Sequence, residues 1–404
     1  MNKATTAKEN TDNAQVREKI RLAYNSALTK DISDQKGEVQ KSTFEDELTT
    51  EFPGKTIEIG ESANKKEWIV TIDGVTENVP IGKDTPKEVL TKQADGTFKD
   101  SNNNEWVWIE VPKSVTASVT SDTDIESALR TYCSDIMPIG TSSDSYTTTT
   151  HGNADTWYDG CGLTEQEYIN TKHTMLNSIK ENGGFYIGKY ETGIDGTESV
   201  IAGARTNEGE TTQKAVIKAD VQPYAYVTCS QAETLAKGLA PEGKTTSLLF
   251  GIQWDLVLKY LNVKNAKTIE QLREDSKSWG NYIFDAHNPT ISCDPFYITS
   301  SNAMTSNDNG ITWNPIAKDT EKKETSLLTT GSSSSLAPLN IYDFAGNLYE
   351  LTLEKNSASS YPNTLRGGFF NYWGNSFPAS SRVGYREAPY SSFIGYVGFR
   401  VALY

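Results

Sequence analysis

The chain has 404 residues, a formal net charge of −15 and an aromatic content of 10%. This length predicts more than one domain, and the apolar content of 36% is enough for packed cores, which excludes a wholly disordered chain. The negative charge argues against nucleic-acid binding, which needs a basic surface, and against attachment to an anionic membrane surface. No run of about 18 apolar residues is present, so we expect no membrane-spanning helix within these residues.

The chain contains few cysteines and histidines, and they are spread along it: Cys133, Cys161, Cys229 and Cys293, with His151, His173 and His287. No two cysteines form a C-x-x-C pair, and no histidine lies at the spacing of a zinc site. Four cysteines allow three disulfide pairings, and the sequence does not choose between these pairings and buried thiols. A histidine-based metal site or catalytic triad is not expected.

Helical periodicity dominates the start of the chain. Apolar residues recur every three or four positions over 14–28, which predicts an amphipathic helix. A second helix is predicted to begin at Ser42, in a capping-box pattern. Alternating apolar residues over 56–59 and 68–72 predict antiparallel strands. We therefore expect residues 1–85 to form a small domain with a helix and an antiparallel sheet.

The strings AQVREKIRLAYNSALTKDISDQ and EWIVTIDG resemble the soluble part of type IV pilin-like proteins. In that family, an apolar N-terminal helix holds the subunit first in the membrane and then in the fibre core. The printed sequence does not include such a helix, so the resemblance implies contact with a membrane only through that missing segment. It also implies that other pilin subunits are partners. An unrelated α+β module with the same pattern is the alternative.

Residues 86–104 are polar and rich in Lys, Asp and Asn, which predicts a linker. The run EWVWIEVP, which starts at Glu105, predicts the first strand of a second domain. Capping boxes at Thr164 and Ser230 predict two helices, and the apolar residues of 250–261 predict a third. Beyond these helices, Gly, Ser, Asn and aromatic residues predict short strands and long loops.

Four segments of this second region share the order and spacing of a known family: GGFYIGKYETG, SWGNY, NIYDFAGNLYELT, and the C-terminal region with RGGFF and YVGFRVALY. Together they resemble the formylglycine-generating-enzyme (sulfatase-modifying-factor) family, a branch of the C-type-lectin-like folds. The resemblance covers roughly residues 105–404. The expected fold class is therefore α+β: a pilin-like helix and small antiparallel sheet, then a C-type-lectin-like domain with long loops.

The chemistry of that family is not expected in this chain. Its oxidases need two cysteines after the RGG motif, where a copper ion and a thiol substrate meet, and the stretch after Gly368 contains no cysteine. Its iron enzymes use a histidine cluster on an attached helical domain, which three scattered histidines do not supply. We therefore expect no enzymatic activity and no copper or iron cofactor. A catalytically altered relative of these oxidases is the alternative.

The resemblance also implies a structural calcium site in the segment D-x-x-G-N-x-x-E. Matched residue by residue, its ligands would be the side chains of Asp343 and Glu350 and the carbonyl groups of Gly346 and Leu348. Calcium takes about six to eight oxygen ligands of this kind. The alternative is that the two acidic side chains only cap turns.

The RGG motif and the terminal GFR motif are expected to form a frame. Gly367 and Gly368 allow positive φ angles or a close approach of the backbone. Arg366 and Arg400 each carry a planar guanidinium group, which can bridge carboxylates or carbonyl groups. Together, these two arginines are predicted to clamp the ends of a long loop.

Aromatic residues are dense between Phe369 and Tyr396, where Asn and Ser separate them. Rigid rings with small polar neighbours are typical of adaptable binding surfaces. About half of these rings are expected to be buried, with Phe369 and Phe399 in the core. The predicted ligand-binding residues lie on loops 370–377 and 383–393: Phe370, Asn371, Tyr372, Trp373, Asn375, Phe377, Tyr385, Arg386, Glu387, Tyr390, Ser392 and Phe393.

In one branch of the lectin-like family, diversity-generating retroelements rewrite the final segment and favour codons for Asn and Tyr. The mix of Asn, Tyr, Ser and Phe between RGG and GFR fits that pattern. The leading hypothesis is a cell-surface, pilus-associated adhesin whose lectin-like domain binds a protein or glycan ligand. A minor pilin with a structural or priming role is the main alternative.

Overall fold

The computed structural model describes residues 13, 15–17, 19–27, 30–31, 39–62, 67–80, 90–136, 155–195, 214–225, 227–283, 296–298, 313–315, 327–356, 362–385 and 396–404. The chain is a mixed α+β protein with several antiparallel sheets. It divides into two compact units, Met1–Glu88 and Val89–Tyr404. Within the ranges above, no helix is both long and apolar enough to cross a membrane.

Helical residues between positions 13 and 31 begin the first unit, and α2 (Lys41–Glu51) follows. The strands β1 (Ile57–Glu61), β2 (Glu67–Ile72) and β3 (Val75–Pro80) form an antiparallel sheet in that order. Burial alternates along β2, as the sequence pattern predicts. The core combines residues of both helices with the inner face of the sheet: Ile20, Ala23, Ala27, Val39, Phe44, Leu48, Phe52, Trp68, Val70, Ile72 and Val79.

The capping box predicted at Ser42 is wrong. Helix α2 begins at Lys41, and its N-cap, Gln40, makes no side-chain capping bond. The carboxylate of Asp31 takes that role, because it accepts hydrogen bonds from the Gln40 amide at 2.7 Å and the Thr43 hydroxyl at 2.9 Å. A carboxylate at a helix N-terminus also complements the helix dipole. A residue from the preceding helix therefore does what a local cap was expected to do.

The second unit is built on a six-stranded sheet in which every pairing is antiparallel. Its strands, in spatial order, are β10 (Thr246–Leu248), β17 (Val401–Leu403), β7 (Gly184–Gly188), β6 (Glu105–Glu110), β5 (Phe98–Asp100) and β4 (Leu90–Lys92). The C-terminal strand β17 is thus an interior strand. It pairs with β10 on one side and with β7 on the other.

Strands β4 and β5 lie in the range that composition predicts to be a linker, residues 86–104. The polar residues of this range are used inside the fold. The Asp100 carboxylate accepts hydrogen bonds from the Asn104 side chain at 3.0 Å and the Trp106 indole at 3.2 Å. The Lys189 ammonium, which belongs to the residue after β7, lies 2.9 Å from Asp95 in the turn between β4 and β5. Composition alone does not distinguish such internal partners from a solvated linker.

A second sheet of four strands carries the C-terminal motifs, in the order β15 (Val383–Tyr385), β14 (Asn363–Arg366), β13 (Tyr349–Lys355) and β16 (Val397–Phe399). Strand β13 pairs with β14 in antiparallel fashion and with β16 in parallel fashion. Two small ribbons complete the strands: β8 (Gly193–Ile194) with β9 (Ala215–Val216), and β11 (Phe296–Ile298) with β12 (Trp313–Pro315).

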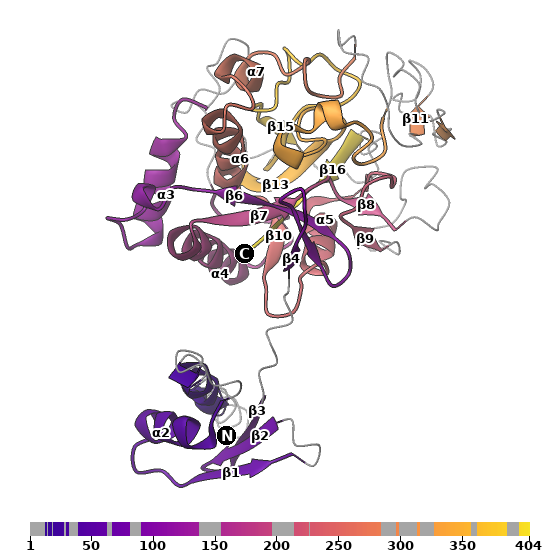
Figure 1. Ribbon diagram of the computed structural model, residues 1–404. Helices are drawn as coiled ribbons and strands as arrows, with labels where there is room; N and C mark the ends of the chain where they lie inside the picture. The colour runs from indigo at the N-terminus through magenta and orange to yellow at the C-terminus, as the bar shows by residue number, and fades with distance from the viewer. Residues whose placement is uncertain are drawn as a thin grey trace. The chain divides into compact units, whose positions relative to one another are not determined.

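The α-helices of this unit are α3 (Asp122–Tyr132), α4 (Glu165–Asn177), α5 (Cys229–Lys237), α6 (Gly251–Val263) and α7 (Ile269–Arg273). Short helical turns are η1 (Lys113–Val115), η2 (Ser178–Asn182), η3 (Ser334–Leu336) and η4 (Pro338–Asn340). Helix α3 contacts α4 and α6, and α6 contacts strands of both sheets, β6 and β13. Figure 1 shows α6 beside the sheets, with α7 and β15 at the end of the unit away from α4.

Two of the three predicted helices begin as the sequence indicates. The capping box of Thr164 and Glu167 starts α4, and α6 buries the apolar residues expected of it. The capping box at Ser230 is wrong, because Thr228 and Gln231 form it two residues earlier. Glu233, which the sequence assigned to that box, is fully buried and accepts a hydrogen bond from the Leu248 amide instead.

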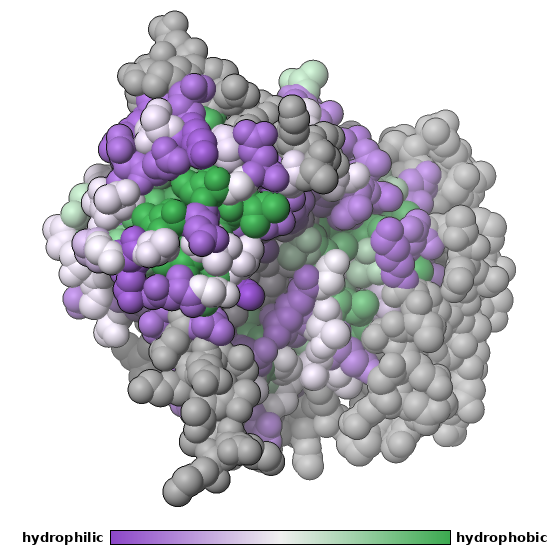
Figure 2. Space-filling view, turned by 90° about the horizontal axis from the view of Figure 1, so that it is seen from below, coloured by the Kyte–Doolittle hydropathy of each residue, from purple (hydrophilic) through white to green (hydrophobic). Residues whose placement is uncertain are grey.

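Large hydrophobic side chains are exposed at six of the described positions: Leu22, Ile169, Val263, Leu339, Tyr372 and Trp373. Figure 2 shows hydrophobic residues in patches between hydrophilic ones on one face of the molecule. Tyr372 and Trp373 are the only pair of these six that are consecutive in sequence. They lie in the loop after β14, at the position where the sequence predicts a binding surface.

Candidate ligand-binding surface

The candidate binding surface is on the loop after β14, which begins with two glycines. Gly367 has a φ angle of 88° and Gly368 one of 76°, in the left-handed region that favours glycine. A Cβ atom on Gly368 would lie 2.4 Å from the Phe377 carbonyl oxygen and 2.7 Å from the Tyr282 ring. The loop that leaves β14 therefore returns to its starting point at Phe377. The sequence-based expectation for these two glycines is confirmed.

Neighbouring segments hold the backbone of this loop in place. The carbonyl groups of Tyr372 and Gly374 accept hydrogen bonds from the amides of Ile283 and Ser276, at 3.0 and 3.2 Å. Gly374 packs so closely against Lys277 that a Cβ atom on Gly374 would lie 2.5 Å from the backbone nitrogen of Lys277. Main-chain contacts thus help to position the loop.

The rings around the loop form one connected aromatic cluster, made of Tyr349, Phe369, Phe370, Tyr372, Trp373, Phe377 and Tyr396. Phe369 is its centre, with ring centroids 4.7 Å from Tyr396, 4.8 Å from Tyr349 and 5.8 Å from Tyr372. Exposure rises outward, from 8% at Phe369 to 37% at Tyr372 and 50% at Trp373. The cluster thus has a buried base and an exposed edge.

The predicted contact residues fall into three groups. Tyr372, Trp373 and Asn375 are exposed, whereas Asn371, Phe377 and Tyr385 are half-buried. Phe370 is only 1% exposed, so its side chain belongs to the base of the cluster and does not reach the surface. The remaining five, Arg386, Glu387, Tyr390, Ser392 and Phe393, lie outside the described residues.

The expected burial of Phe369 and Phe399 is confirmed. Tyr396, the last residue of the predicted aromatic stretch, joins the cluster from the position before β16. Tyr349, which the sequence did not single out, joins it from β13. Burial raises the pKa of Tyr396 to about 12. Its hydroxyl is therefore neutral at physiological pH.

The two ends of the loop meet in a group of four buried charges, which we call the arginine clamp: Arg366, Arg382, Asp255 and Glu354. Arg366 bonds Asp255 at 2.7 Å and Glu354 at 2.8 Å. Arg382 bonds the second oxygen of each of these carboxylates, with Glu354 at 2.7 Å. Arg366 precedes the loop and Arg382 follows it, so both ends of the loop are fixed on the same two acids.

The clamp keeps its charges because each carboxylate faces two guanidinium groups. Burial acts to raise the pKa of Glu354, but Arg382 and Arg366 outweigh it and the pKa falls to about 2. The pKa of Arg382 is raised, since its attraction to Asp255 and Glu354 exceeds the cost of burial. The guanidinium group of Arg366 also lies over the Trp254 ring, 5.5 Å from its centroid.

The prediction that Arg400 clamps the loop together with Arg366 is wrong. Arg400 bonds Glu350, at 2.8 Å for the shortest contact, and the carbonyl groups of Gly188 and Tyr342 at 2.9 and 2.8 Å. It therefore joins β17 to β13 and β7, and Arg382 takes the place assigned to it. The sequence contains one hint of the clamp, since Asp255 is an acidic residue within the apolar run of α6.

The calcium ligands implied by the resemblance do not fit at Glu350. Both oxygens of that carboxylate face the Arg400 guanidinium, at 3.1 and 3.2 Å from its Nε atom, where a calcium ion would meet a positive charge. The Asp343 carboxylate accepts a hydrogen bond from the Gly331 amide at 2.8 Å. Among the residues that the structure describes, no three or more His, Cys, Asp or Glu side chains are grouped to hold a metal ion.

Calcium binding through Asp343, Gly346 and Leu348 remains a prediction, and a thermal titration tests it. A rise in Tm with added calcium chloride that Asp343→Asn abolishes would support the prediction. An unchanged Tm over the millimolar range would remove it. Magnesium chloride at the same ionic strength is the control.

The three acids around this segment carry more charge than their partners neutralise. Glu191, Asp343 and Glu350 are all buried, and Arg400 is the cation that acts on all three. Burial raises the pKa of Asp343 to about 7, and burial together with the charges of Asp343 and Glu350 raises that of Glu191 well above its usual range. We call Glu191, Asp343, Glu350 and Arg400 the acidic cluster.

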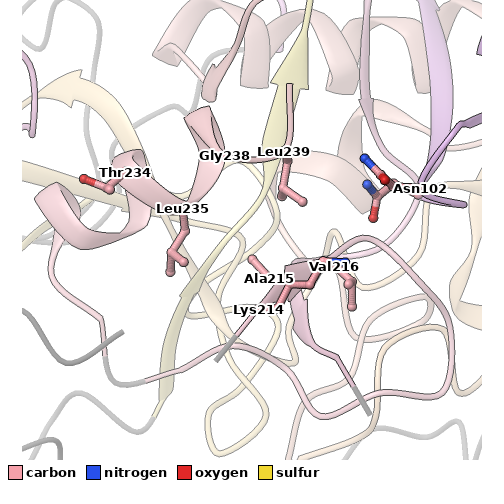
Figure 3. A pocket seen from close by; sticks show the side chains of 9 residues that line it. Asn102, Lys214, Ala215, Val216, Thr234, Leu235, Gly238 and Leu239 are labelled. Atoms are coloured by element: carbon pink, nitrogen blue, oxygen red, sulfur yellow. The ribbon is translucent and has the colours of Figure 1, made fainter. Parts of the chain in front are cut away.

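A small pocket lies elsewhere in the second unit, with a volume of about 210 Å³. It is bounded by the end of α5, by β9 and by the turn that contains Asn102. Figure 3 shows Leu235 and Leu239 pointing toward the strand that carries Ala215 and Val216. The pocket is smaller than most ligand sites, which span roughly 300–1,000 Å³, and none of the predicted binding residues lines it.

Comparisons of the chain with protein families, with curated proteins and with solved structures find no match. The functional argument therefore rests on the geometry of the aromatic cluster and its supports. That geometry consists of an exposed ring pair, a hydrogen-bonded loop backbone and a buried charge group that fixes both loop ends.

Proposed function

We propose that this protein is a surface-displayed adhesin or receptor-binding protein, and that it binds a protein or glycan ligand through the exposed edge of the aromatic cluster. Tyr372 and Trp373 on a fixed loop are the observation that carries the proposal. In this proposal the second unit has a C-type-lectin-like fold. The first unit is pilin-like and assembles with other pilin subunits at the cell surface.

Exposed rings on a fixed loop favour binding for an energetic reason. Tyr and Trp offer a large apolar area with few rotatable bonds, and such residues dominate the binding energy of many interfaces. The loop backbone is already ordered by its contacts with Ile283 and Ser276. A ligand would therefore meet a preorganised surface and would not have to order the loop on binding.

A binding role without catalysis is supported by the state of the thiols. Cys133, Cys161 and Cys229 are buried. Burial raises the pKa of Cys133 and of Cys161, which disfavours the reactive thiolate form. None of the three is part of the aromatic cluster.

The proposal is tested with the full chain and the double variant Tyr372→Ala, Trp373→Ala. Ile169→Ala with Val263→Ala is a matched control, since those side chains are exposed by 50% and 49% at other places. Binding is measured by surface plasmon resonance against a defined panel of immobilised glycans and purified surface proteins. We expect wild type and control to bind the same panel members, and the ring variant to bind them at least about tenfold more weakly.

Equal binding by the ring variant and wild type would contradict the proposal, as would a wild-type chain that binds no member of the panel. Normal fibre assembly in the ring variant, together with lost binding, would separate adhesion from a structural role. Lost assembly with intact binding would favour the minor-pilin alternative.

A further inference from the structure

Two cysteines that are 68 positions apart in sequence meet in the interior of the second unit. Cys161 lies in the loop before α4, and Cys229 is the first residue of α5. The Cys229 sulfur lies 4.0 Å from the Cys161 carbonyl oxygen. Both side chains are fully buried. The Cys161 sulfur lies 3.6 Å from the Leu163 carbonyl oxygen, both cysteines are free thiols, and the fold brings the Cys229 thiol against the backbone of Cys161.

The backbones of the two segments are also in contact. Gly162 has a φ angle of 84°, and a Cβ atom there would lie 2.7 Å from the Cα atom of Ser230. Because Gly162 and Ser230 each follow one of the cysteines, this contact brings the two cysteine backbones close together. A disulfide needs Cα atoms about 4.4–6.8 Å apart, which such a backbone contact allows.

The surroundings of the pair are closed and specific. The Tyr158 hydroxyl lies 3.5 Å from the Cys229 sulfur and donates a hydrogen bond to the Thr352 carbonyl oxygen at 3.2 Å. Cys133 lies elsewhere, at the end of α3 and close to Asp255 and Lys259. Of the three cysteines that the structure describes, only Cys161 and Cys229 are neighbours.

We propose that Cys161 and Cys229 form a disulfide bond when the chain folds in oxidising surroundings. The two S–H bonds break and one S–S bond forms. The two electrons and two protons pass to a small-molecule or protein disulfide, which is reduced to two thiols. Because both sulfurs end up buried, the bond forms during folding, before the interior closes, and the folded chain then shields it from external thiols.

The bond would stabilise the second unit, which carries the proposed binding surface. It would link the segment that leads into α4 with the start of α5, and both contact β13 through Thr352. That strand also carries Glu354 of the arginine clamp. A cross-link over 68 positions removes much of the freedom of the unfolded chain, so it stabilises the folded unit.

The test refolds the full chain in a buffer of oxidised and reduced glutathione and counts thiols by alkylation in denaturant. Of the four cysteines, two are expected to react before reduction and all four after it. A non-reducing peptide map is expected to contain one cross-linked species, which joins the peptides of Cys161 and Cys229. The Tm of the oxidised chain should exceed that of the reduced chain by on the order of 5 °C.

Serine variants identify the pair. Cys161→Ser and Cys229→Ser should each lose the cross-linked species and the Tm difference, whereas Cys133→Ser and Cys293→Ser should retain both. Four reactive thiols after refolding in oxidised glutathione would overturn the proposal, and so would a map that joins any other pair. If a serine variant fails to fold, the non-reducing peptide map of the wild-type chain still identifies which cysteines are joined. The proposal is independent of ligand binding.

Discussion

Strand β13 contributes one acid to each of two buried charge groups, Glu354 to the arginine clamp and Glu350 to the acidic cluster. The two groups differ in their balance of charge, and the contrast shows what sets the pKa of a buried acid. In the arginine clamp, two guanidinium groups face two carboxylates, and the pKa of Glu354 falls to about 2. In the acidic cluster, the one guanidinium group bonds Glu350 alone among the three acids, and the pKa of Asp343 rises to about 7. The acids of both groups are buried. Burial acts to raise the pKa in both groups, and the number of arginines nearby decides whether that effect is outweighed.

The largest expected effect comes from Glu354→Gln, which breaks the clamp. The variant leaves Arg366 and Arg382 with one buried carboxylate, and we expect it to lower the free energy of unfolding by about 3–5 kcal/mol at pH 7. Urea denaturation measures this value. Lys277→Met removes an exposed ion pair with Asp275 and is the control, with an expected change below about 1 kcal/mol. A cost for Glu354→Gln no larger than that of the control would contradict the clamp.

The same substitution in the acidic cluster should have the opposite sign. A pKa that is raised in the folded state means that the folded chain binds more protons, so stability falls as pH rises from about 4 to 7. Glu191→Gln removes one of the like charges, while its amide oxygen still accepts the hydrogen bond from Asn347. We expect it to stabilise the fold by on the order of 2 kcal/mol at pH 8 and by much less at pH 5.

Urea denaturation at both pH values measures the effect of Glu191→Gln. Glu354→Gln provides the comparison, because the stability from a lowered pKa is present above the usual value of 4.5 and disappears as pH falls toward 2. Its cost should therefore persist from pH 8 to pH 5. If Glu191→Gln and Glu354→Gln both destabilised the fold at pH 8, the number of nearby arginines would not explain the difference between the acidic cluster and the arginine clamp.

Glu233 extends the comparison to a buried acid that pairs with no arginine in the described residues. Burial raises its pKa to about 8, against the opposing hydrogen bond from the Leu248 amide. Stability is therefore lost as pH rises from about 4.5 to 8. Glu233→Gln should stabilise the chain at pH 9, by a few kcal/mol at most, and leave it unchanged near pH 4. A thermal melt at each pH measures the difference, and an equal gain at both would contradict the assignment.

The smallest effect is expected at the exposed edge of the aromatic cluster. Tyr372→Ser with Trp373→Ser should change the free energy of unfolding by less than about 1 kcal/mol, because both side chains are partly solvated and the loop is held through its backbone. Gly368→Ala is the contrasting variant, since its Cβ atom would meet the Phe377 carbonyl oxygen at 2.4 Å. A ring variant as unstable as Gly368→Ala would mean that the rings hold the loop.

Local signals in the sequence predict the parts of the fold that depend on local chemistry. The RGG turn, the cap at Thr164 and the apolar face of α6 are all present as expected. The burial of Phe369 also follows from the sequence, since a dense aromatic run cannot be fully exposed. These features need only neighbours in sequence, or a periodic pattern.

Features that depend on distant partners were not predictable in the same way. Arg382 and Asp255 are 127 positions apart, so no local pattern pairs them. The polar stretch around Asp95 joins a sheet through β6, and Lys189, 94 positions after Asp95, binds its turn. Ser230 with Glu233 and Thr228 with Gln231 are both capping-box patterns, and the structure uses Thr228 with Gln231. The Glu233 side chain, which the other pattern needs, accepts a hydrogen bond from the buried Leu248 amide. In each case a tertiary contact decides between local alternatives.

The interior position of β17 has a consequence for synthesis on the ribosome. Strand β7 gains one of its two partners only when Val401–Leu403 emerge, and Arg400 bonds the carbonyl group of Gly188, which was made 212 positions earlier. The large sheet therefore closes only after Val401–Leu403 have been made. A product cut short before residue 400 would leave the edges of β7 and β10 open to other chains. Such incomplete copies would be prone to aggregation.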